Sequence, residues 1–507
     1  MSLDSGISLL IEIQIGENMV KIAMIGAGSA GFCRLLVQDI LTYESMKRAH
    51  IALMDIDHER LDTSLKVMEN MKFQNRLECS FSATTDRREA LKDANFAICM
   101  IQAGGLDAYT IDVEIPLKHG VDQCVGDTLN PGGIFRGLRH VPILMGILKD
   151  IEEVSKPNVI FLNYANPMAI CTWAIQKQFP HIASIGLCHG VQHTTNMLCD
   201  WLRIARNEVD VLVAGINHMA WFLKFEHWGK DLYPLLWEKL DKEGLIEGEH
   251  YRFEMMKATS FFMTESSGHL SEYLPYFRHR KDIQDMFSGK KFAGETAGNL
   301  RGLKPYYEEN DRQMDAWATG KVLVPYSATE RSVEWAGPII NAKLTGQYTR
   351  FVGNILNTGN LIENLSADSC VEVPIFVDRL GMYPTRVGKL PDHCAALCNS
   401  NISVQRLAVR AAIEGDMEAV FHACLLDPLT AATLAPHEIR NMVDEMLIAE
   451  AQWLPQFAGK TNDSPGHRIG RIISGGDVGQ KVSKLDSIIS FHDGVKKSMK
   501  ENTAITL

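Results

Sequence analysis

The amino-acid sequence predicts an α/β protein, with a doubly wound parallel sheet in its N-terminal part and an α+β domain after it. Short apolar runs recur up to residue 195, as in parallel strands that are covered on both faces. Each run ends in a glycine-rich or polar turn, which a segment with helical spacing follows. Beyond that point, paired strand-like runs and charged helical segments replace this alternation. The predicted boundaries are 1–18 for an N-terminal extension, 19–195 for the sheet domain, 196–460 for the second domain and 461–507 for a tail.

The composition excludes two classes of partner. The 507 residues carry a net charge of -11, whereas nucleic-acid-binding proteins usually carry a basic field. No run approaches the roughly 18 apolar residues of a membrane span, so no membrane partner is expected. The apolar run Ile7–Ile15 is interrupted by Glu12 and Gln14 and has no basic region before it. It therefore indicates an extension and not a signal peptide.

The cysteines indicate the compartment. All eleven are irregularly spaced, and no CxxC pair occurs. This usage is typical of a reducing environment, where cysteine behaves as a small hydrophobic residue. We therefore expect a cytoplasmic protein.

A glycine fingerprint follows the first apolar run. Val20–Ile25 is predicted to be a strand, Gly26-Ala-Gly-Ser-Ala-Gly31 a turn and Phe32–Leu41 a helix. Gly26 permits the tight turn, Gly28 lets the backbone approach a pyrophosphate, and Gly31 allows the helix to pack closely on the strand. The beginning of the helix then offers unpaired N–H groups to the pyrophosphate. This arrangement is typical of a Rossmann-type dinucleotide site.

The second strand favours NAD as the dinucleotide. His50–Met54 ends at Asp55, which lies 24 residues beyond Gly31. A carboxylate at this distance binds the ribose hydroxyls and would repel the 2′-phosphate of NADP. The alternative is a packing turn with an incidental capping aspartate.

Later strands also end in polar or glycine-rich turns. These are Phe96–Ile101 before Gln102–Gly105, Val159–Asn163 before Asn166, and Ile182–Leu187 before Cys188. A further glycine-rich loop, Gly126–Gly133, leads into a helix predicted from about Ile134. The carboxyl ends of parallel strands meet at one edge of a sheet, so all these turns should converge. Asn166 donates and accepts hydrogen bonds without carrying charge, which suits sugar hydroxyls, or it caps the helix that Pro167 begins.

Two short stretches supply metal-type ligands. Cys188 and His189 follow one strand, and Asn217 and His218 lie between the predicted strands 209–216 and 219–225. A thiolate and an imidazole suit a divalent transition metal, and two protein ligands leave positions open for a substrate. The alternative is a buried cysteine and a core histidine without a ligand.

The rest of the chain carries weaker signals. A polar cluster that includes Glu265 and His269 follows the apolar run at Phe261. We expect helices with loops over 281–312, strand and turn chemistry over 351–365 and a strand over 370–378. We also expect helices over 407–447, with breaks at Pro428 and Pro436.

Six blocks together resemble family 4 of the glycoside hydrolases, the NAD- and Mn²⁺-dependent glycosidases, from residue 19 to about 456. They are Ile25-Gly-Ala-Gly-Ser29, Asp127-Thr-Leu-Asn-Pro-Gly-Gly-Ile134, Asn163-Tyr-Ala-Asn-Pro-Met168, Gly186-Leu-Cys-His189, Ala214-Gly-Ile-Asn-His-Met219 and Thr264-Glu-Ser-Ser267. The likeness is strongest to melibiase-type α-galactosidases, because Cys followed by His accompanies unphosphorylated sugars. The resemblance implies a second domain of the lactate/malate dehydrogenase type and a homodimer or homotetramer.

The resemblance also implies an unusual route for hydrolysis. NAD⁺ takes a hydride from C3 of the sugar, and Mn²⁺ stabilises the charge on the resulting ketone as a Lewis acid. A base removes the C2 proton, and the aglycone leaves from C1 by elimination with help from an acid. Water then adds, and NADH restores C3, so the cofactor is not consumed. The substrate is therefore expected to be a terminal α-galactoside.

The resemblance assigns residue roles. The metal ligands are Cys188 and His218, and the leaving-group acid is His189, since histidine can donate a proton near neutral pH. Asn166 matches the substrate-binding residue. The cofactor-binding residues are Gly26, Gly28, Ser29, Gly31, Asp55 and Asn130.

The sequence departs from the family pattern at the base. Many members use a tyrosine there, but the corresponding run here is Phe261-Phe262, which has no hydroxyl. Glu265, Tyr273 and a metal-bound hydroxide are the candidate replacements.

Two glycines bear on the sugar. The α-galactosidase pattern has Ser at Gly190, and Gly268 replaces an acidic residue. Glycine at position 190 is found in members that act on α-uronides, so α-galacturonides or α-glucuronides are alternatives, as are α-glucosides. Rival functions of other classes are an NAD-dependent 2-hydroxy-acid dehydrogenase, which the first part of the chain alone would suggest, and a non-catalytic NAD sensor.

Overall fold

A computed structural model describes residues 19–287 and 297–460. The described residues up to Ala458 form one compact unit. The predicted extension 1–18 and the predicted tail 461–507 lie outside the described residues. The predicted boundary at residue 195 stays a prediction.

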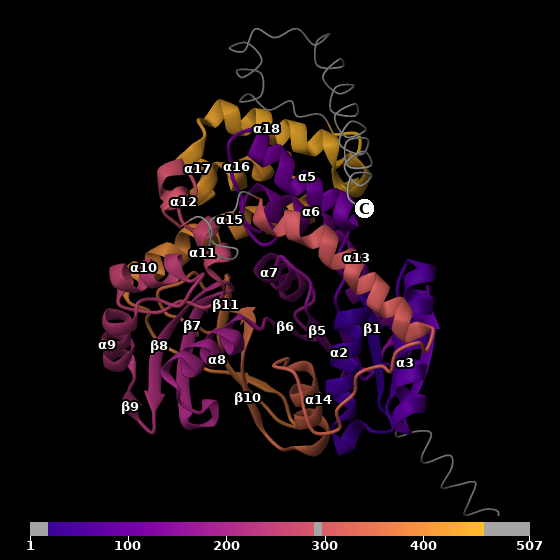
Figure 1. Ribbon diagram of the computed structural model, residues 1–507. Coiled ribbons are helices and arrows are strands. Elements are labelled where there is room, and N and C mark those ends of the chain that lie inside the picture. Colours follow the sequence, from indigo (N-terminus) through magenta and orange to yellow (C-terminus); the bar gives the residue numbers. More distant parts are fainter. Residues whose placement is uncertain (1–18, 288–296, 461–507) are drawn as a thin grey trace, which may run out of the picture. The chain divides into compact units, whose positions relative to one another are not determined.

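The N-terminal strands form a parallel sheet (Figure 1). Their order in the sheet is β3-β2-β1-β4-β5-β6, which places neighbouring strand ends side by side. The strands are β1 Lys21–Ile25, β2 His50–Met54, β3 Ser80–Thr84, β4 Phe96–Cys99, β5 Ile160–Asn163 and β6 Ala183–Gly186. The helices that connect them or pack on them are α2 Ala30–Leu41, α3 His58–Asn75, α4 Arg87–Leu91, α5 Gly105–Lys118, α6 Asn130–Val154 and α7 Met168–Gln178.

Both faces of this sheet are covered. Along β1, Ile22 and Met24 belong to one apolar cluster, and Ala23 and Ile25 belong to another. The first cluster includes residues of α2 and α3 and extends into the second half of the chain, whereas the other includes residues of α4, α7 and the second half of α6. Alternate side chains of a strand point to opposite faces, so a strand buried on both faces needs a continuous apolar run. This is the pattern from which the sheet was predicted.

The sheet continues into an antiparallel half. Gly186 of β6 pairs with Asn354 of β10, and the order runs on through β11, β7, β8 and β9, with β12 beside β11. These strands are β7 Val209–Ile216, β8 Met219–His227, β9 Lys230–Asp231, β10 Thr349–Leu356, β11 Cys370–Val377 and β12 Met382–Pro384. The α/β class with a parallel N-terminal sheet and an α+β second part is therefore confirmed.

The remaining helices pack on both halves of the sheet, and α13 and α14 lie against α2 and α3 of the first half (Figure 1). Helices α5, α6, α15, α16 and α18 pack together in one layer. Their bounds are α8 Gly190–Leu202, α9 Tyr233–Glu243, α10 His250–Thr259, α11 Ser267–Tyr273, α12 Lys281–Phe287, α13 Gly298–Ala318, α14 Ala336–Thr345, α15 Asp392–Glu414, α16 Met417–Leu426, α17 Pro428–Thr433 and α18 Pro436–Ala449. Short 3-10 turns are η1 Glu44–Met46, η2 Arg206–Glu208, η3 Ala451–Trp453 and η4 Pro455–Phe457.

The structure agrees with most predicted elements, corrects the start of one helix and adds one strand. The strands around His218 and the breaks between helices at Pro428 and Pro436 are confirmed, and α17 and α18 begin at these prolines. Helix α6 begins at Asn130 and not near Ile134, because Pro131 fits the first helical turn and the glycines continue it. Strand β3 was not predicted, because its sequence Ser-Phe-Ser-Ala-Thr lies at a half-exposed edge and lacks an apolar run.

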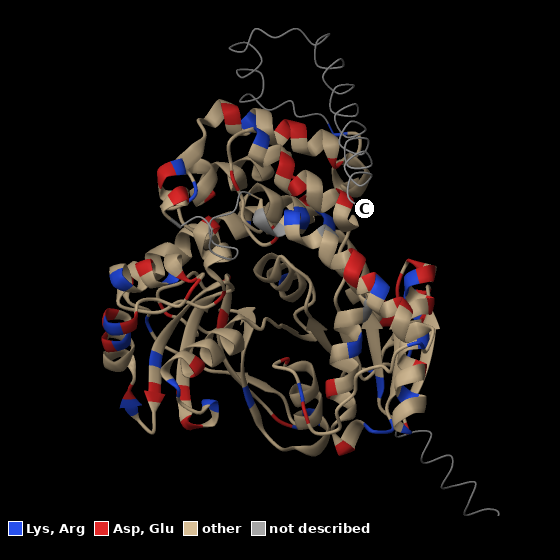
Figure 2. Ribbon diagram, in the orientation of Figure 1, with Lys and Arg blue, Asp and Glu red and all other residues tan. Residues whose placement is uncertain are grey.

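The outer helices carry charges of both signs (Figure 2). Acidic and basic side chains are interspersed along outer helices such as α3, α9 and α13 (Figure 2). None of the helices within the described residues combines the length and the apolar character needed to cross a bilayer.

Candidate active site

The predicted turns do converge. Strands β2, β1, β4, β5 and β6 are consecutive in the sheet and parallel, so the turns after them share one edge. The turn that carries His218 joins β7 to β8, and Glu265 lies on the segment before α11. This edge therefore gathers polar residues from both halves of the chain.

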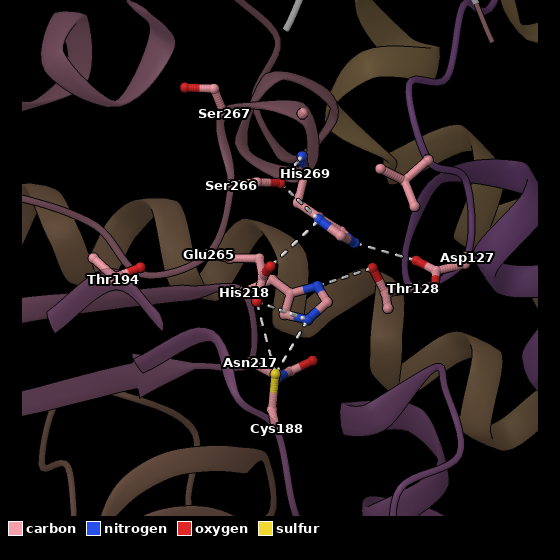
Figure 3. A network of polar contacts seen from close by, with 12 residues as sticks. Asp127, Thr128, Cys188, Thr194, Asn217, His218, Glu265, Ser266, Ser267 and His269 are labelled. Atoms are coloured by element: carbon pink, nitrogen blue, oxygen red, sulfur yellow. Dashed lines mark hydrogen bonds and ion pairs between the residues drawn. The ribbon is translucent and has the colours of Figure 1, made fainter. Parts of the chain in front are cut away.

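Three donor atoms meet at this edge (Figure 3). Cys188 Sγ lies 3.5 Å from His218 Nε2 and 3.7 Å from Glu265 Oε2. The His218 Nε2 and Glu265 Oε2 atoms are 3.5 Å apart. The two predicted metal ligands are thus brought together, and a carboxylate joins them.

The size of this triangle fits a metal ion. A point equidistant from three atoms about 3.6 Å apart lies about 2.1 Å from each (3.6 divided by √3). Bonds from a divalent transition metal to imidazole, carboxylate and thiolate are roughly 2.0–2.3 Å long. A sulfur, nitrogen and oxygen donor set also suits such an ion. The residues therefore fit a divalent metal, with positions left for a substrate.

The backbone at two of the three donors is strained. His218 and Glu265 have φ angles of 63° and 68°, in the left-handed region that non-glycine residues rarely occupy. Such conformations cost about 1–3 kcal/mol each and cluster at functional sites. They aim both side chains at Cys188.

Gly190 provides the space for this arrangement. A Cβ atom at Gly190 would lie well inside contact distance of Glu265 Oε2. Gly190, which the sequence pattern connected with the choice of sugar, thus leaves room for the Glu265 carboxylate.

Two of the three donors are already in the protonation state that binds a metal. Burial, together with the neighbouring His269, lowers the pKa of His218 to about 4, so its ring is neutral near pH 7. Burial would raise the pKa of Glu265, but His218, His269 and His189 lower it to about 2. Burial and the Glu265 charge raise the pKa of the Cys188 thiol well above 9. A bound cation would stabilise the thiolate.

His269 extends the cluster on one side (Figure 3). Its Nδ1 lies 3.7 Å from Glu265 Oε1 and its Nε2 lies 3.4 Å from Asp127 Oδ1. Burial lowers the pKa of His269, but Asp127 and Glu265 outweigh it and raise the pKa to about 9. Asn166 donates from Nδ2 to Asp127 Oδ2 over 3.0 Å. The predicted sugar-binding amide therefore belongs to the same network.

Tyr273 lies behind His218. Its hydroxyl donates to Thr128 Oγ1 over 2.8 Å, and Thr128 Oγ1 is 3.4 Å from His218 Nδ1. Burial raises the pKa of Tyr273 well above 10. Of the two predicted base residues, Glu265 lies in the donor cluster, whereas Tyr273 supports His218 from the far side.

His189 faces a separate partner. Its Nδ1 lies 3.0 Å from Glu334 Oε1, and this hydrogen bond is the main reason that the pKa of His189 is raised. The charges of Glu265 and His269 also act on its ring, so His189 adjoins the cluster.

The predicted glycine turn is present between β1 and α2, but Gly31 does not serve the packing of α2 on the strand, because a Cβ there would meet only Asn310 of α13. Gly26 has a φ of 92°, and a Cβ atom there would meet the backbone of Met100 at 2.9 Å. Gly28 donates its N–H to Asp55 Oδ2 over 2.7 Å. Ser29 precedes the first turn of α2 and is exposed. The glycines and the carboxylate thus occupy the positions of a nucleotide cradle.

Helix α13 lies over this cradle. A Cβ atom at Gly31 would come within 2.7 Å of Asn310 Oδ1. Tyr307 donates to Gln102 Oε1 over 3.2 Å, in the turn after β4. Nothing in the sequence of α13 indicated this placement.

Asn130 lies apart from the cradle in a buried network. Its Nδ2 donates to the Glu272 carbonyl over 2.8 Å and to Asp427 Oδ1 over 2.9 Å. These contacts join α6, α11 and α17. Its assignment to the cofactor stays a prediction.

Sequence reasoning missed several residues of the site. Asp127 and Thr128 stand in the glycine-rich loop, and His269 stands in a polar cluster, so position beside a motif was a usable signal. Glu334 and Glu372 carry no local signal. Glu372 accepts from Asn217 Nδ2 over 3.4 Å and from Asn354 Nδ2 over 3.0 Å, and burial raises its pKa to about 7.

The fold and the site define a Rossmann-type protein with a thiol, imidazole and carboxylate cluster beside its nucleotide cradle. The family 4 glycosyl hydrolase model matches residues 21–204, and the model of that family's C-terminal domain matches residues 213–430. The chain belongs to family 4 of the glycosyl hydrolases. It is accordingly a glycoside hydrolase, which sets aside the dehydrogenase and sensor alternatives.

Curated relatives extend over nearly the whole chain. An α-galactosidase of Rhizobium meliloti is 40% identical, over 86% of this chain and 90% of its own length. An α-galactosidase of Bacillus subtilis is 37% identical, over 87% of this chain and 100% of its own length. An α-galacturonidase of Bacillus subtilis is 31% identical, over 81% of this chain and 94% of its own length.

Solved structures share the fold. The Bacillus subtilis protein lplD superposes with a TM-score of 0.75 and 28% identity, covering 85% of this chain and 100% of that chain. A 6-phospho-α-glucosidase from gut microorganisms, solved in complex with NAD and Mn²⁺, gives a TM-score of 0.74 and 21% identity, covering 86% of this chain and 99% of that chain.

Proposed function

We propose that this protein hydrolyses terminal α-galactosides with the help of bound NAD and a divalent metal ion, Mn²⁺. The observation that carries the proposal is the triangle of Cys188, His218 and Glu265 at the sheet edge that also holds the glycine cradle. A hydrolase that used only two carboxylates would need neither feature. The 6-phospho-α-glucosidase of the same fold, which holds NAD and Mn²⁺, supports the choice of cofactors.

The cofactors would be held by residues already in place. Gly26, Gly28 and Asp55 would hold NAD, and the three donors of the triangle would hold the metal. When bound, NAD supplies a hydride acceptor and the metal supplies a Lewis acid.

The side chains around the cluster divide the proton transfers. Glu265 places Oε2 at the cluster and Oε1 3.7 Å from His269 Nδ1, and Oε1 would accept the C2 proton of the sugar. His189 donates a proton to the leaving oxygen. Asn166, which Asp127 holds in position, would bind a sugar hydroxyl.

The choice of an uncharged sugar follows from relatives and from charge. The two relatives of highest identity quoted above are α-galactosidases. Asp127, Glu265 and Glu334 place three carboxylates around the site, and these would repel a uronate. Gly190 favoured a uronide in the sequence, but the room it leaves is taken by Glu265. The α-galacturonidase function, which the Bacillus subtilis relative supports, is the second candidate.

One experiment separates these functions. The protein is incubated with an aryl α-galactoside or an aryl α-galacturonide in D₂O, with NAD⁺, Mn²⁺ and a thiol. We expect faster release from the galactoside, loss of activity with a chelator, and deuterium at C2 of the released sugar. Faster release from the galacturonide would favour the second candidate. Cleavage that a chelator leaves unchanged would contradict the use of a metal.

Compartment and assembly are also proposals. Every cysteine of the chain lies in the described part, and all eleven are free, which supports a cytoplasmic location. The family resemblance supports a homodimer or homotetramer, which sedimentation of the purified protein would test.

A further inference from the structure

A buried carboxylate stands behind the proposed acid. Glu334 Oε1 lies 3.0 Å from His189 Nδ1. The His189 side chain is 49% exposed, whereas that of Glu334 is only 5% exposed. An exposed imidazole can rotate freely unless a fixed partner holds it. Glu334 is such a partner.

The segment that carries Glu334 is tied down from three directions. Ser332 donates its N–H and its hydroxyl to Asp39 of α2. The Gln192 amide of α8 donates to the carbonyls of Val333 over 3.2 Å and Cys188 over 3.3 Å. Two residues after Glu334, the N–H of Ala336 donates to the Tyr164 hydroxyl over 3.1 Å. These contacts bring residues 332–336 and the Cys188 strand end into one rigid arrangement.

The hydrogen bond selects one state of the ring. A histidine that donates from Nδ1 to a carboxylate keeps its proton on that atom and turns Nε2 to the opposite side. A carboxylate in this position fixes the orientation and the tautomer of a catalytic histidine without itself exchanging a proton. At His189, this leaves Nε2 as the atom that meets the leaving oxygen.

We propose that Glu334 is a positioning residue, which holds His189 so that Nε2 protonates the leaving group. The proposal rests on the proposed function of His189. His189 acts as the acid in its imidazolium form, in which both ring nitrogens carry a proton. Nε2 loses its proton, the oxygen of the aglycone gains it, and the bond between C1 and that oxygen breaks, while Nδ1 keeps its proton toward Glu334. Glu334 keeps its charge throughout.

The first test determines which ring nitrogen of His189 carries the proton. Glu334→Gln keeps the shape of the side chain, but an amide donates as well as accepts, so it no longer selects one tautomer. Glu330→Gln is the matched control, because Glu330 is an exposed glutamate of the same segment. Ring ¹⁵N spectra of the full chain at alkaline pH, with the His189 signal assigned by its loss in His189→Asn, should show protonated Nδ1 in wild type and the control. Glu334→Gln should show both tautomers.

The second test measures how well His189 transfers a proton to the leaving group. A slow acid step lets the sugar that has lost its C2 proton take up deuterium and return to substrate. With methyl α-galactoside in D₂O, the ratio of deuterium in unreacted substrate to cleavage should rise about 10-fold in Glu334→Gln. It should stay unchanged in Glu330→Gln, and Mn²⁺ affinity measured by calorimetry should stay unchanged in both.

The outcomes separate the two proposals. If Glu334→Gln lowers exchange and cleavage by the same factor, or if its His189 ring keeps the wild-type tautomer, Glu334 is only structural and the inference is overturned. If the wild-type protein neither exchanges nor cleaves an α-galactoside, the proposed function fails. The ring spectra would then still decide whether Glu334 holds His189.

Discussion

Cys188 is a thiol that must lose its proton to bind a metal. Burial and the charges of Glu265 and Glu372 raise its pKa well above 9, so the thiol is protonated at pH 7. His218, with a pKa of about 4, is already neutral there, and Glu265, with a pKa of about 2, is already ionised. The proton that leaves on metal binding therefore comes from Cys188.

This predicts a measurable proton release. Calorimetric titration with Mn²⁺ at pH 7, in buffers of different ionisation enthalpy, should report about one proton released per ion. Below the thiol pKa, each unit rise in pH should strengthen binding about tenfold. Cys188→Ser should bind at least about 100-fold more weakly and release no proton. Cys199→Ser, a buried cysteine outside the cluster, is the control. Wild-type binding without proton release would show that Cys188 is not a ligand.

The close contact between Gly190 and Glu265 predicts that a side chain at position 190 weakens metal binding. In Gly190→Ala, the new Cβ would displace the Glu265 carboxylate from the cluster. Mn²⁺ affinity should then fall about 10-fold, as in Glu265→Gln, and the double variant should be no weaker than either single one. Gly302→Ala, where a Cβ meets nothing within 4 Å, should match wild type. Additive losses would mean that Gly190 acts on the metal independently of Glu265.

At the scale of elements, the β1 turn and the end of β2 act together. Asp55 accepts the N–H of Gly28 and that of Asp57, so its carboxylate is fixed beside the glycine turn. Asp57 caps α3 through the N–H groups of Glu59 and Arg60 and has no such place in the cradle. These two neighbouring carboxylates therefore serve different elements.

Because Asp55 and Asp57 serve different elements, we expect only a substitution of Asp55 to change the preference for NAD⁺ over NADP⁺. Asp55→Asn keeps an acceptor for Gly28 but removes the charge that binds ribose hydroxyls and repels a 2′-phosphate. NAD⁺ affinity, followed by fluorescence titration, should fall about 10-fold, while NADP⁺ affinity should stay level or rise. Asp57→Asn should change the preference for neither nucleotide. An unchanged preference in Asp55→Asn would remove Asp55 from the cofactor site.

At the scale of the whole molecule, the continuous sheet joins the two halves. Gly186 of β6 pairs with Asn354 of β10, and α15 from the second half packs on α6 and α7 of the first. Cores that share strands and helices lose their packing together.

We therefore expect one unfolding transition. Calorimetry, far-ultraviolet and near-ultraviolet circular dichroism should give coincident transitions, with equal calorimetric and van't Hoff enthalpies. NAD and Mn²⁺ should each raise the midpoint, because both bind only the folded edge. Two separate transitions would support independent folding of residues 19–195 and 196–460.

Much of the fold could be predicted from the sequence. Buried parallel strands need continuous apolar runs, and the glycines of the first turn have few other uses, so the parallel sheet, the cradle and the convergence of strand ends could be predicted. Pro428 and Pro436 likewise predicted breaks between helices, because proline cannot continue a preceding helix. Strand β3 could not be predicted from an apolar run, because a strand at an exposed edge of a sheet does not require apolar residues.

Only part of the candidate active site could be predicted from the sequence. Cys188 and His218 could be placed because each follows a recognisable strand. The sequence by itself thus determined the α/β class, the nucleotide turn and two of the three donors, since each depends on local patterns of polarity and glycine. Only the tertiary structure decided that Glu265 completes the triangle, that Gly190 makes room for it and that Glu334 holds His189. These relations join residues as many as 145 positions apart, and chain folding alone brings them within hydrogen-bonding distance.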